Sequence, residues 1–270
     1  MIIRETTLSN IECLRKEYFE SLPEFQELYL ELMLANATFF LFNKENEAAG
    51  YAIISTEKVL IEFYVKPCFL NKSQQLFNEL ISQEKPESIY CKTFDSLLLN
   101  ACLTEGYVCS ILGVLFRHYC ETEIIKDKRI MIQTATEKDF PLLLNQKDDL
   151  AELYETETLL RHFIRDKNLY MFMLEEDLLG CGMILRTHKD FPYHDLGVWV
   201  SSKFRRQGYA TQIIDWLRKH CLENNWIPTC GCAFDNIGSQ KTLEKSGFRS
   251  KYKLLEFSIN QVNNIQNVKA

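Results

Sequence analysis

The sequence predicts an α/β protein in which one domain occurs twice in tandem. The chain of 270 residues is 46% hydrophobic and 25% charged, which is typical of globular proteins and excludes disordered or fibrous classes. A weak internal repeat has a period of about 130 residues, the size of a whole domain. Within each copy, short apolar strands alternate with amphipathic helices, as in layered α/β domains.

The repeat is recognised by an offset that only grows along the chain. It is 129 near the start, 130 where residues 48–54 match 178–184, and 141 where residues 104–107 match 245–248. A duplication followed by small insertions in the second copy produces this drift, whereas chance matches would scatter. We place the boundary in the charged stretch Glu123–Arg129, which gives domains 1–126 and 127–270.

Each copy is expected to run strand, helix, helix, three strands, helix, strand, helix, strand. In the second copy the expected strands are residues 170–174, 180–186, 193–200, a short one from Pro228, and 252–259, and the expected helices are 149–166, 208–225 and 236–246. The helix at 208–225 places Ala210, Ile213, Ile214, Leu217 and Cys221 on one face.

Charge and cysteine content narrow the function classes. The net charge of −6 argues against a nucleic-acid-binding protein. Residues 1–126 carry −7 and residues 127–270 carry +1, so the second half is the better host for an anionic ligand. Ten cysteines without a signal peptide indicate free thiols in the cytoplasm, and the lone pair Cys230 and Cys232 does not make a metal site. No apolar run approaches the ~18 residues that a membrane span needs.

A basic loop precedes the helix at 208–225. Lys203, Arg205 and Arg206 lie within four residues, and Gly208 permits positive φ and close backbone approach to a ligand. The amides at a helix start bind anions, so the segment Arg206–Thr211 is expected to hold a diphosphate. The alternative is a solvated turn that only connects a strand to a helix.

The order strand, Arg205-x-x-Gly208-x-Ala210, long helix, strand, Asn236-x-x-Ser239 and Ser246-Gly247-Phe248 resembles the GNAT N-acetyltransferase superfamily over residues 130–258. The resemblance implies that each domain has a mixed, mostly antiparallel central sheet flanked by helices. It also implies that the second domain binds acetyl-CoA. The cofactor-binding residues that it implies are Val198, Trp199 and Val200 along pantetheine, Arg205, Arg206, Gln207, Gly208, Tyr209, Ala210 and Thr211 at the phosphates, and Asn236 and Ser239 opposite. For Asn236 a helix N-cap is the alternative role.

The first copy resembles the same fold with a degenerate site. Its corresponding loop, residues 69–75, has no glycine and a single cation, and Ser96 is expected where Asn236 stands in the second copy. This copy is expected to buttress the second domain or to wall the acceptor cleft.

The expected reaction is direct attack of an amine on the thioester in a ternary complex. The candidate base is Asp195, with His194 on the opposite strand face as the alternative. In many family members a tyrosine at the position of Leu243 protonates the departing thiolate. Here Tyr193, Tyr209 or solvent is expected to supply that proton.

The acceptor is expected to be the amine of a small molecule or amino-acid-like compound. Acyl length and the identity of the acceptor stay open. A non-catalytic acyl-CoA sensor is the alternative function, and a structural protein without a cofactor is the third. Neither nucleic acid nor membrane is an expected partner.

Overall fold

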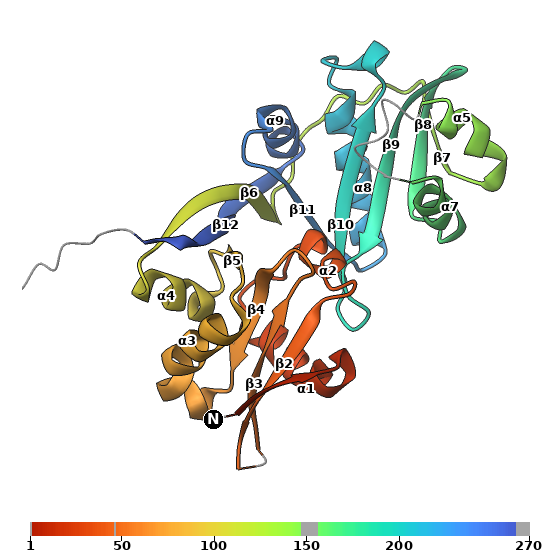
Figure 1. Ribbon diagram of the computed structural model, residues 1–270. Helices are drawn as coiled ribbons and strands as arrows, with labels where there is room; N and C mark the ends of the chain where they lie inside the picture. The colour runs from red at the N-terminus through yellow and green to blue at the C-terminus, as the bar shows by residue number, and fades with distance from the viewer. Residues whose placement is uncertain (1, 46, 147–155, 263–270) are drawn as a thin grey trace, which may run out of the picture. The chain divides into compact units, whose positions relative to one another are not determined.

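The computed structural model describes residues 2–45, 47–146 and 156–262, and it separates into two compact units. Unit 1 consists of Met1–Leu115 and Tyr252–Ala270, and unit 2 consists of Phe116–Lys251. Both sequence copies show the predicted order of elements, coloured along the chain in Figure 1.

The first copy contains β1 (Ile2–Thr6), α1 (Leu8–Ser21), α2 (Leu28–Leu32), β2 (Thr38–Lys44), β3 (Glu47–Ile54), β4 (Val59–Val65), η1 (Pro67–Lys72), α3 (Ser73–Glu84), β5 (Ser88–Lys92), α4 (Ser96–Thr104) and β6 (Tyr107–Tyr119). The second contains β7 (Ile130–Thr134), η2 (Glu137–Asp139), α5 (Phe140–Leu144), α7 (Glu157–Arg165), β8 (Leu169–Leu174), β9 (Asp177–Arg186), β10 (Tyr193–Val200), η3 (Ser202–Phe204), α8 (Tyr209–Glu223), β11 (Ile227–Ala233), α9 (Ile237–Lys245) and β12 (Phe248–Val262). The helix expected at 149–166 is α7 in its second half, and residues 149–155 lie outside the described residues.

The sheet of unit 1 has the strand order β1-β2-β3-β4-β5-β12-β6, and β6 contributes Tyr107–Leu115 to this unit. All its pairs with a described register are antiparallel except β4 with β5, so the predicted mixed, mostly antiparallel sheet is confirmed. The strand next to β5 is β12, which pairs from Leu254↔Lys92 to Ser258↔Ser88. The last strand of the second sequence copy therefore completes the sheet of unit 1. The boundary between 126 and 127 stays a prediction about the sequence copies, because the compact units divide the chain differently.

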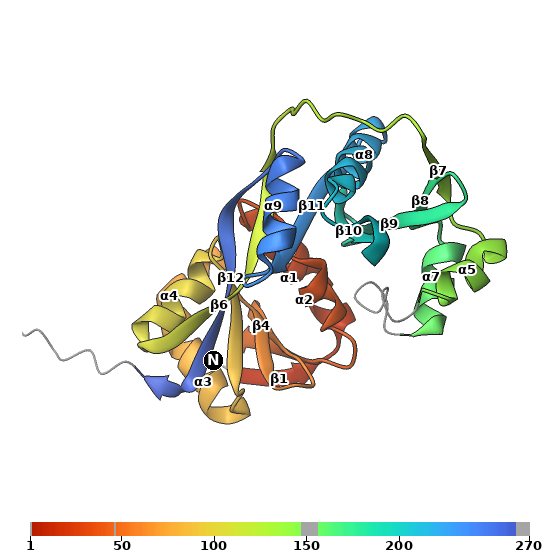
Figure 2. The same ribbon diagram turned by 90° about the horizontal axis from the view of Figure 1, so that it is seen from above.

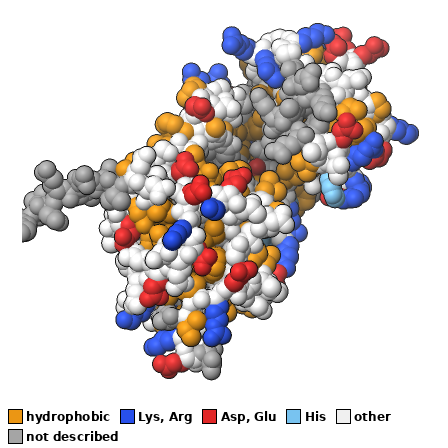
Figure 3. Space-filling model, in the orientation of Figure 1, with side chains coloured by type: hydrophobic (Ala, Val, Ile, Leu, Met, Phe, Trp, Pro, Cys, Tyr) orange, Lys and Arg blue, Asp and Glu red, His pale blue; other side chains and the backbone are white. Residues whose placement is uncertain are grey.

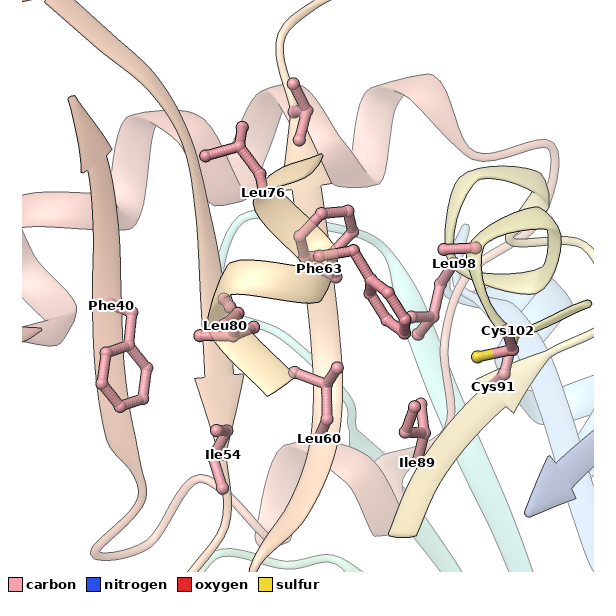
Figure 4. Close-up of a cluster of buried hydrophobic side chains, with 14 of the residues drawn as sticks. Phe40, Ile54, Leu60, Phe63, Leu76, Leu80, Ile89, Cys91, Leu98 and Cys102 are labelled. Atoms are coloured by element: carbon pink, nitrogen blue, oxygen red, sulfur yellow. The ribbon is translucent and has the colours of Figure 1, made fainter. Parts of the chain in front are cut away.

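The core of unit 1 lies between its sheet and the helices α3 and α4. Figure 4 shows Leu76 and Leu80 from α3 and Leu98 from α4 over the strand residues Leu60 and Phe63. Phe257 of β12 is fully buried in the same cluster. Complete burial of such a phenyl ring is worth roughly 1.5–3 kcal/mol, so β12 is an integral part of this core.

Unit 2 has β11, β10, β9, β8 and β7 in that order, with β6 beside β11. The helix α8 packs on one face of β9 and β10, where Gly182 leaves room for Leu217: a Cβ at Gly182 would lie 2.9 Å from its side chain. On the other face, α5 and α7 cover a core that includes Cys181 and Trp199. Of the five residues predicted for the apolar face of α8, Ile213, Ile214, Leu217 and Cys221 are buried and Ala210 is half-buried.

Three features of composition are visible in the structure. None of the described helices combines the length and the hydropathy needed to cross a bilayer. None of the ten cysteines, all of which lie in the described part of the chain, forms a disulfide, and five of them are buried. On the face shown in Figure 3, Lys and Arg side chains are interspersed with Asp and Glu side chains.

Candidate acyl-CoA site in unit 2

The site begins where two parallel strands diverge. β10 pairs with β11 only from Tyr193↔Ile227 to Asp195↔Thr229, whereas its antiparallel pairing with β9 continues to Val200↔Gly180. Among the strands that the structure describes, β10 therefore has a ladder partner on one side only beyond Asp195. Its second edge is open to a ligand that can exchange backbone hydrogen bonds, as a pantetheine amide can. Figures 1 and 2 show β10 and β11 with α8 and α9 around this region.

The basic loop after β10 has a left-handed backbone at two positions. Arg206 has φ +62° and Gly208 has φ +86°, and α8 begins directly after Gly208 without a side-chain cap. Such a backbone turns successive N–H groups into a concave anion-binding nest, and a residue other than glycine in this conformation is strained. The N–H groups of the first turn of α8 consequently stay available to an anion.

The side chain of Arg205 is held by a backbone carbonyl at the end of β10. Its Nε donates to the carbonyl oxygen of Val200 at 2.9 Å, which fixes the side chain beside the end of β10. Phe204 is buried beneath the loop and meets the ring of Tyr209 edge to face, with centroids 6.2 Å apart. The loop is thus anchored at both ends.

These segments line one groove of about 580 Å³. All the predicted cofactor-binding residues line it except Gln207, which is exposed beside it. They are Val198, Trp199, Val200, Arg205, Arg206, Gly208, Tyr209, Ala210, Thr211, Asn236 and Ser239. The structure therefore brings together residues from β10, the loop, α8 and α9.

Asn236 has the structural role that the sequence left as an alternative. Its Oδ1 accepts a hydrogen bond from the backbone N–H of Ser239 at 2.9 Å, so it is the N-cap of α9. The same residue lines the groove. The far end of α9 is tied to α8 because the buried Ser246 donates from its Oγ to the carbonyl oxygen of Thr211 at 3.2 Å.

The predicted base lies at the fork and not in the lining of the groove. Asp195 is the last residue of β10 paired with β11, and by strand alternation its side chain shares a face with Trp199. Its neighbour His194 is buried on the α8 face, where its ring stacks on Trp226 with centroids 4.3 Å apart. Burial lowers the pKa of His194. The two side chains face opposite ways, as predicted.

Many family members have an acid that protonates the departing thiolate, and in this chain the corresponding position is Leu243. Leu243 is buried in the inner face of α9. Of the two tyrosines considered, Tyr209 lines the groove and its Oη lies 3.5 Å from Oδ2 of Asp127. Tyr193 begins β10, on the far side of the fork.

One wall of the groove was not predicted from the sequence. Gly238, Lys241, Thr242 and Lys245 all line it from α9. Lys241 and Thr242 follow Gly238 by three and four residues, and Lys245 follows them by four and three, so all four residues share one helical face. This pattern could be read from the sequence once Asn236 was placed at the start of the helix.

The corresponding loop of unit 1 differs in backbone as well as in sequence. η1 runs into α3 at Ser73, and no residue from 66 to 75 has a positive φ. A hollow of about 320 Å³ lies beside η1 and α3, but neither β4 nor α4 contributes to its lining. The groove of unit 2 thus has no counterpart of the same composition at this hollow.

The diverging strands of unit 1 carry a buried polar network. Glu62 of β4 accepts from Arg15, Gln26 and Tyr51. Lys92 of β5 donates from Nζ to Tyr18 at 2.7 Å. Burial alone would raise the pKa of Glu62, but the Arg15 guanidinium outweighs it and lowers the value.

One sequence correspondence needs correction. The N-cap of α4 is Asp95, which accepts from the N–H of Leu98, whereas Ser96 is the first helical residue. Asp95, and not Ser96, is therefore the counterpart of Asn236. Its carboxylate is buried and accepts from the Oη of Tyr18 at 2.5 Å. The prediction was wrong by one residue because the offset between the two copies changes along this region.

Comparisons with known proteins agree with this geometry. The sequence model of the acetyltransferase (GNAT) domain matches residues 7–119, and that of the acetyltransferase (GNAT) family matches residues 131–248. An uncharacterized N-acetyltransferase, YjdG of Bacillus subtilis, is 35% identical over 65 residues, which is 23% of this chain and 39% of that protein.

Two solved structures share the fold over nearly the whole chain. An acetyltransferase of the GNAT family from Colwellia psychrerythraea is 22% identical, with a TM-score of 0.84 over 96% of this chain and 99% of its own. A tandem GNAT protein from the clavulanic acid biosynthesis pathway is 10% identical, with a TM-score of 0.59 over 95% and 97%. With a family match in each half, the chain belongs to the GNAT acetyltransferases and is a transferase with two GNAT domains in tandem.

Proposed function

We propose that unit 2 binds acetyl-CoA and transfers its acetyl group to the amine of a small molecule or amino-acid-like acceptor. The observation that carries the proposal is the groove itself, where an unpaired strand edge, an anion nest and two arginines meet. In this proposal the diphosphate lies on the amides of Arg206–Thr211. The pantetheine follows Val198–Val200, with Asn236 and Ser239 opposite.

The chemistry requires a neutral amine beside the thioester. An amine with a pKa of about 10.4 is neutral in roughly one molecule in 2,500 at pH 7, so a base is useful. Asp195 at the fork is the proposed base, directly or through water, and such a group contributes about 10²–10⁴ in rate. Alignment of amine and thioester can contribute about 7–11 kcal/mol, and is therefore the larger effect.

The first test measures binding and turnover separately. Calorimetry with CoA reports binding, and release of the CoA thiol from acetyl-CoA across a panel of amines reports transfer. Heat with CoA and thiol release with at least one amine are expected. The absence of any binding would refute the proposal.

The role of Asp195 is tested by replacing it with asparagine. Asp195→Asn should lower kcat about 10²–10⁴-fold with little change in the Kd for CoA. Asp190→Asn is the matched control, because Asp190 is exposed just before β10 and should leave kcat unchanged. Equal activity in both variants would remove Asp195 from the mechanism.

A non-catalytic acyl-CoA sensor remains the second candidate, because Leu243 replaces the usual acid. Binding without thiol release on any amine would favour it. For unit 1 we propose a supporting role without acyl-CoA binding, since the buried network occupies its strand fork.

A further inference from the structure

The proposed cofactor carries one phosphate besides the diphosphate that is assigned to the nest of unit 2. Besides its diphosphate, coenzyme A has a phosphate monoester on the ribose, and such a group carries about −1.5 to −2 charges at pH 7. The nest and the two arginines form one anion site at the start of α8. The ribose phosphate needs positive charge elsewhere along the groove.

The face of α9 toward the groove supplies that charge. Lys241 and Lys245 both line the groove and are both exposed. They are four residues apart on one helix, which places their Cβ atoms about 5–6 Å apart, so both ammonium groups can reach one phosphate. Two like charges at this spacing repel each other, and an anion between them removes that repulsion.

Two other lysines of unit 2 are already paired with acidic side chains. Lys203 is paired with Asp177 at 2.6 Å, and Lys219 with Asp215 at 2.9 Å. Lys241 and Lys245 form no ion pair with any acidic side chain among residues 2–45, 47–146 and 156–262. Their charges are therefore not neutralised within the part of the chain that the structure describes.

The counterpart helix in unit 1 lacks this pair. When α4 and α9 are aligned on their N-caps, Asp95 and Asn236, the positions of Lys241 and Lys245 are Asn100 and Thr104. The lysine pair is thus present only in the copy that has the anion nest.

We infer that Lys241 and Lys245 clamp the ribose 3′-phosphate of coenzyme A and so make the groove selective for CoA over its 3′-dephospho form. This inference rests on the proposed acyl-CoA binding. It assigns residues to the 3′-phosphate, which the diphosphate-binding loop does not contact in the proposed arrangement.

The test compares two ligands on four proteins by calorimetry. The ligands are CoA and 3′-dephospho-CoA, and the proteins are the wild type, Lys241→Gln, Lys245→Gln and the double variant. We expect the wild type to bind CoA about 10-fold more tightly than dephospho-CoA, and the double variant to bind both within 2-fold. The wild-type preference should also narrow at high salt, because exposed charges are screened.

Lys251→Gln is the matched control, because Lys251 is exposed on β12 and outside the groove lining. It should keep the wild-type preference. Equal wild-type affinities for the two ligands, or a preference that survives in the double variant, would overturn the inference and leave acyl-CoA binding intact. If neither ligand binds the wild type, the proposed function itself fails.

Lys245 also lies in the last turn of α9, where a cation stabilises the helix dipole. A purely structural role would weaken both ligands equally and lower the melting temperature. The ratio of the two Kd values separates this role from phosphate recognition, because a structural defect does not change that ratio.

Discussion

Replacement of Gly208 by alanine separates ligand approach from folding. Gly208 has φ +86°, and a Cβ placed there would meet no atom within 4 Å. The folded state therefore bears only the left-handed strain, about 1–2 kcal/mol, and the chain should stay folded with a melting temperature lowered by a few degrees. The same empty space is where the proposed diphosphate must approach the amides.

The binding loss expected for Gly208→Ala is larger than its stability loss. A hydrogen bond to a charged group is worth about 1.5–3 kcal/mol, so displacing the diphosphate from one amide weakens CoA about 10- to 150-fold. Gly182→Ala is the control: its Cβ would press on the flexible side chain of Leu217 at 2.9 Å, which costs stability away from the loop. Calorimetry should show near wild-type affinity for Gly182→Ala.

The reasoning is refuted if Gly208→Ala binds CoA within 2-fold of the wild type while its unfolding shows the expected small loss. The diphosphate would then not approach the start of α8. A loss of affinity in Gly182→Ala equal to that in Gly208→Ala would point to general destabilisation instead.

Three further outcomes are expected. Phe257→Ala should lower the free energy of unfolding in urea by about 3–5 kcal/mol, because the ring is fully buried in unit 1. Its control is Leu103→Ala, at 54% exposure, which should lower it by less than about 0.5 kcal/mol. Similar losses in the two variants would show that β12 is not part of that core. Because burial lowers the pKa of His194, the unfolded chain binds its proton more tightly, and stability should fall as the pH drops below about 6.5; His194→Phe should flatten that profile in thermal melts, and an unchanged slope would contradict the assignment. Lys92→Met leaves the buried carboxylate of Asp95 without its cation and should lower the free energy of unfolding by about 3–5 kcal/mol. Adding Asp95→Asn should restore part of that loss. Strictly additive losses would show that the two side chains do not interact.

Local pattern sufficed for the elements and the anion loop. The order of strands and helices, the exposed and buried faces of α8, and the Arg205–Gly208 loop all depend on residues close in sequence, whose periodicity and backbone preferences act over a few residues. The repeat was readable for the same reason, since each matched segment keeps its own local signature. Asn236 could be placed at a helix start, although its double role as cap and groove wall required the neighbouring elements.

Only the tertiary structure decided which strand pairs with which. Nothing in the alternation of β12 tells whether it adds to the sheet of its own copy or to β5, because side chains alternate identically in either pairing. The fork after Asp195 and the lysine face of α9 likewise depend on strands and helices far apart in the chain. Hydrogen-bond partners across a sheet are chosen by burial summed over the whole fold, and that sum is absent from any local stretch of sequence.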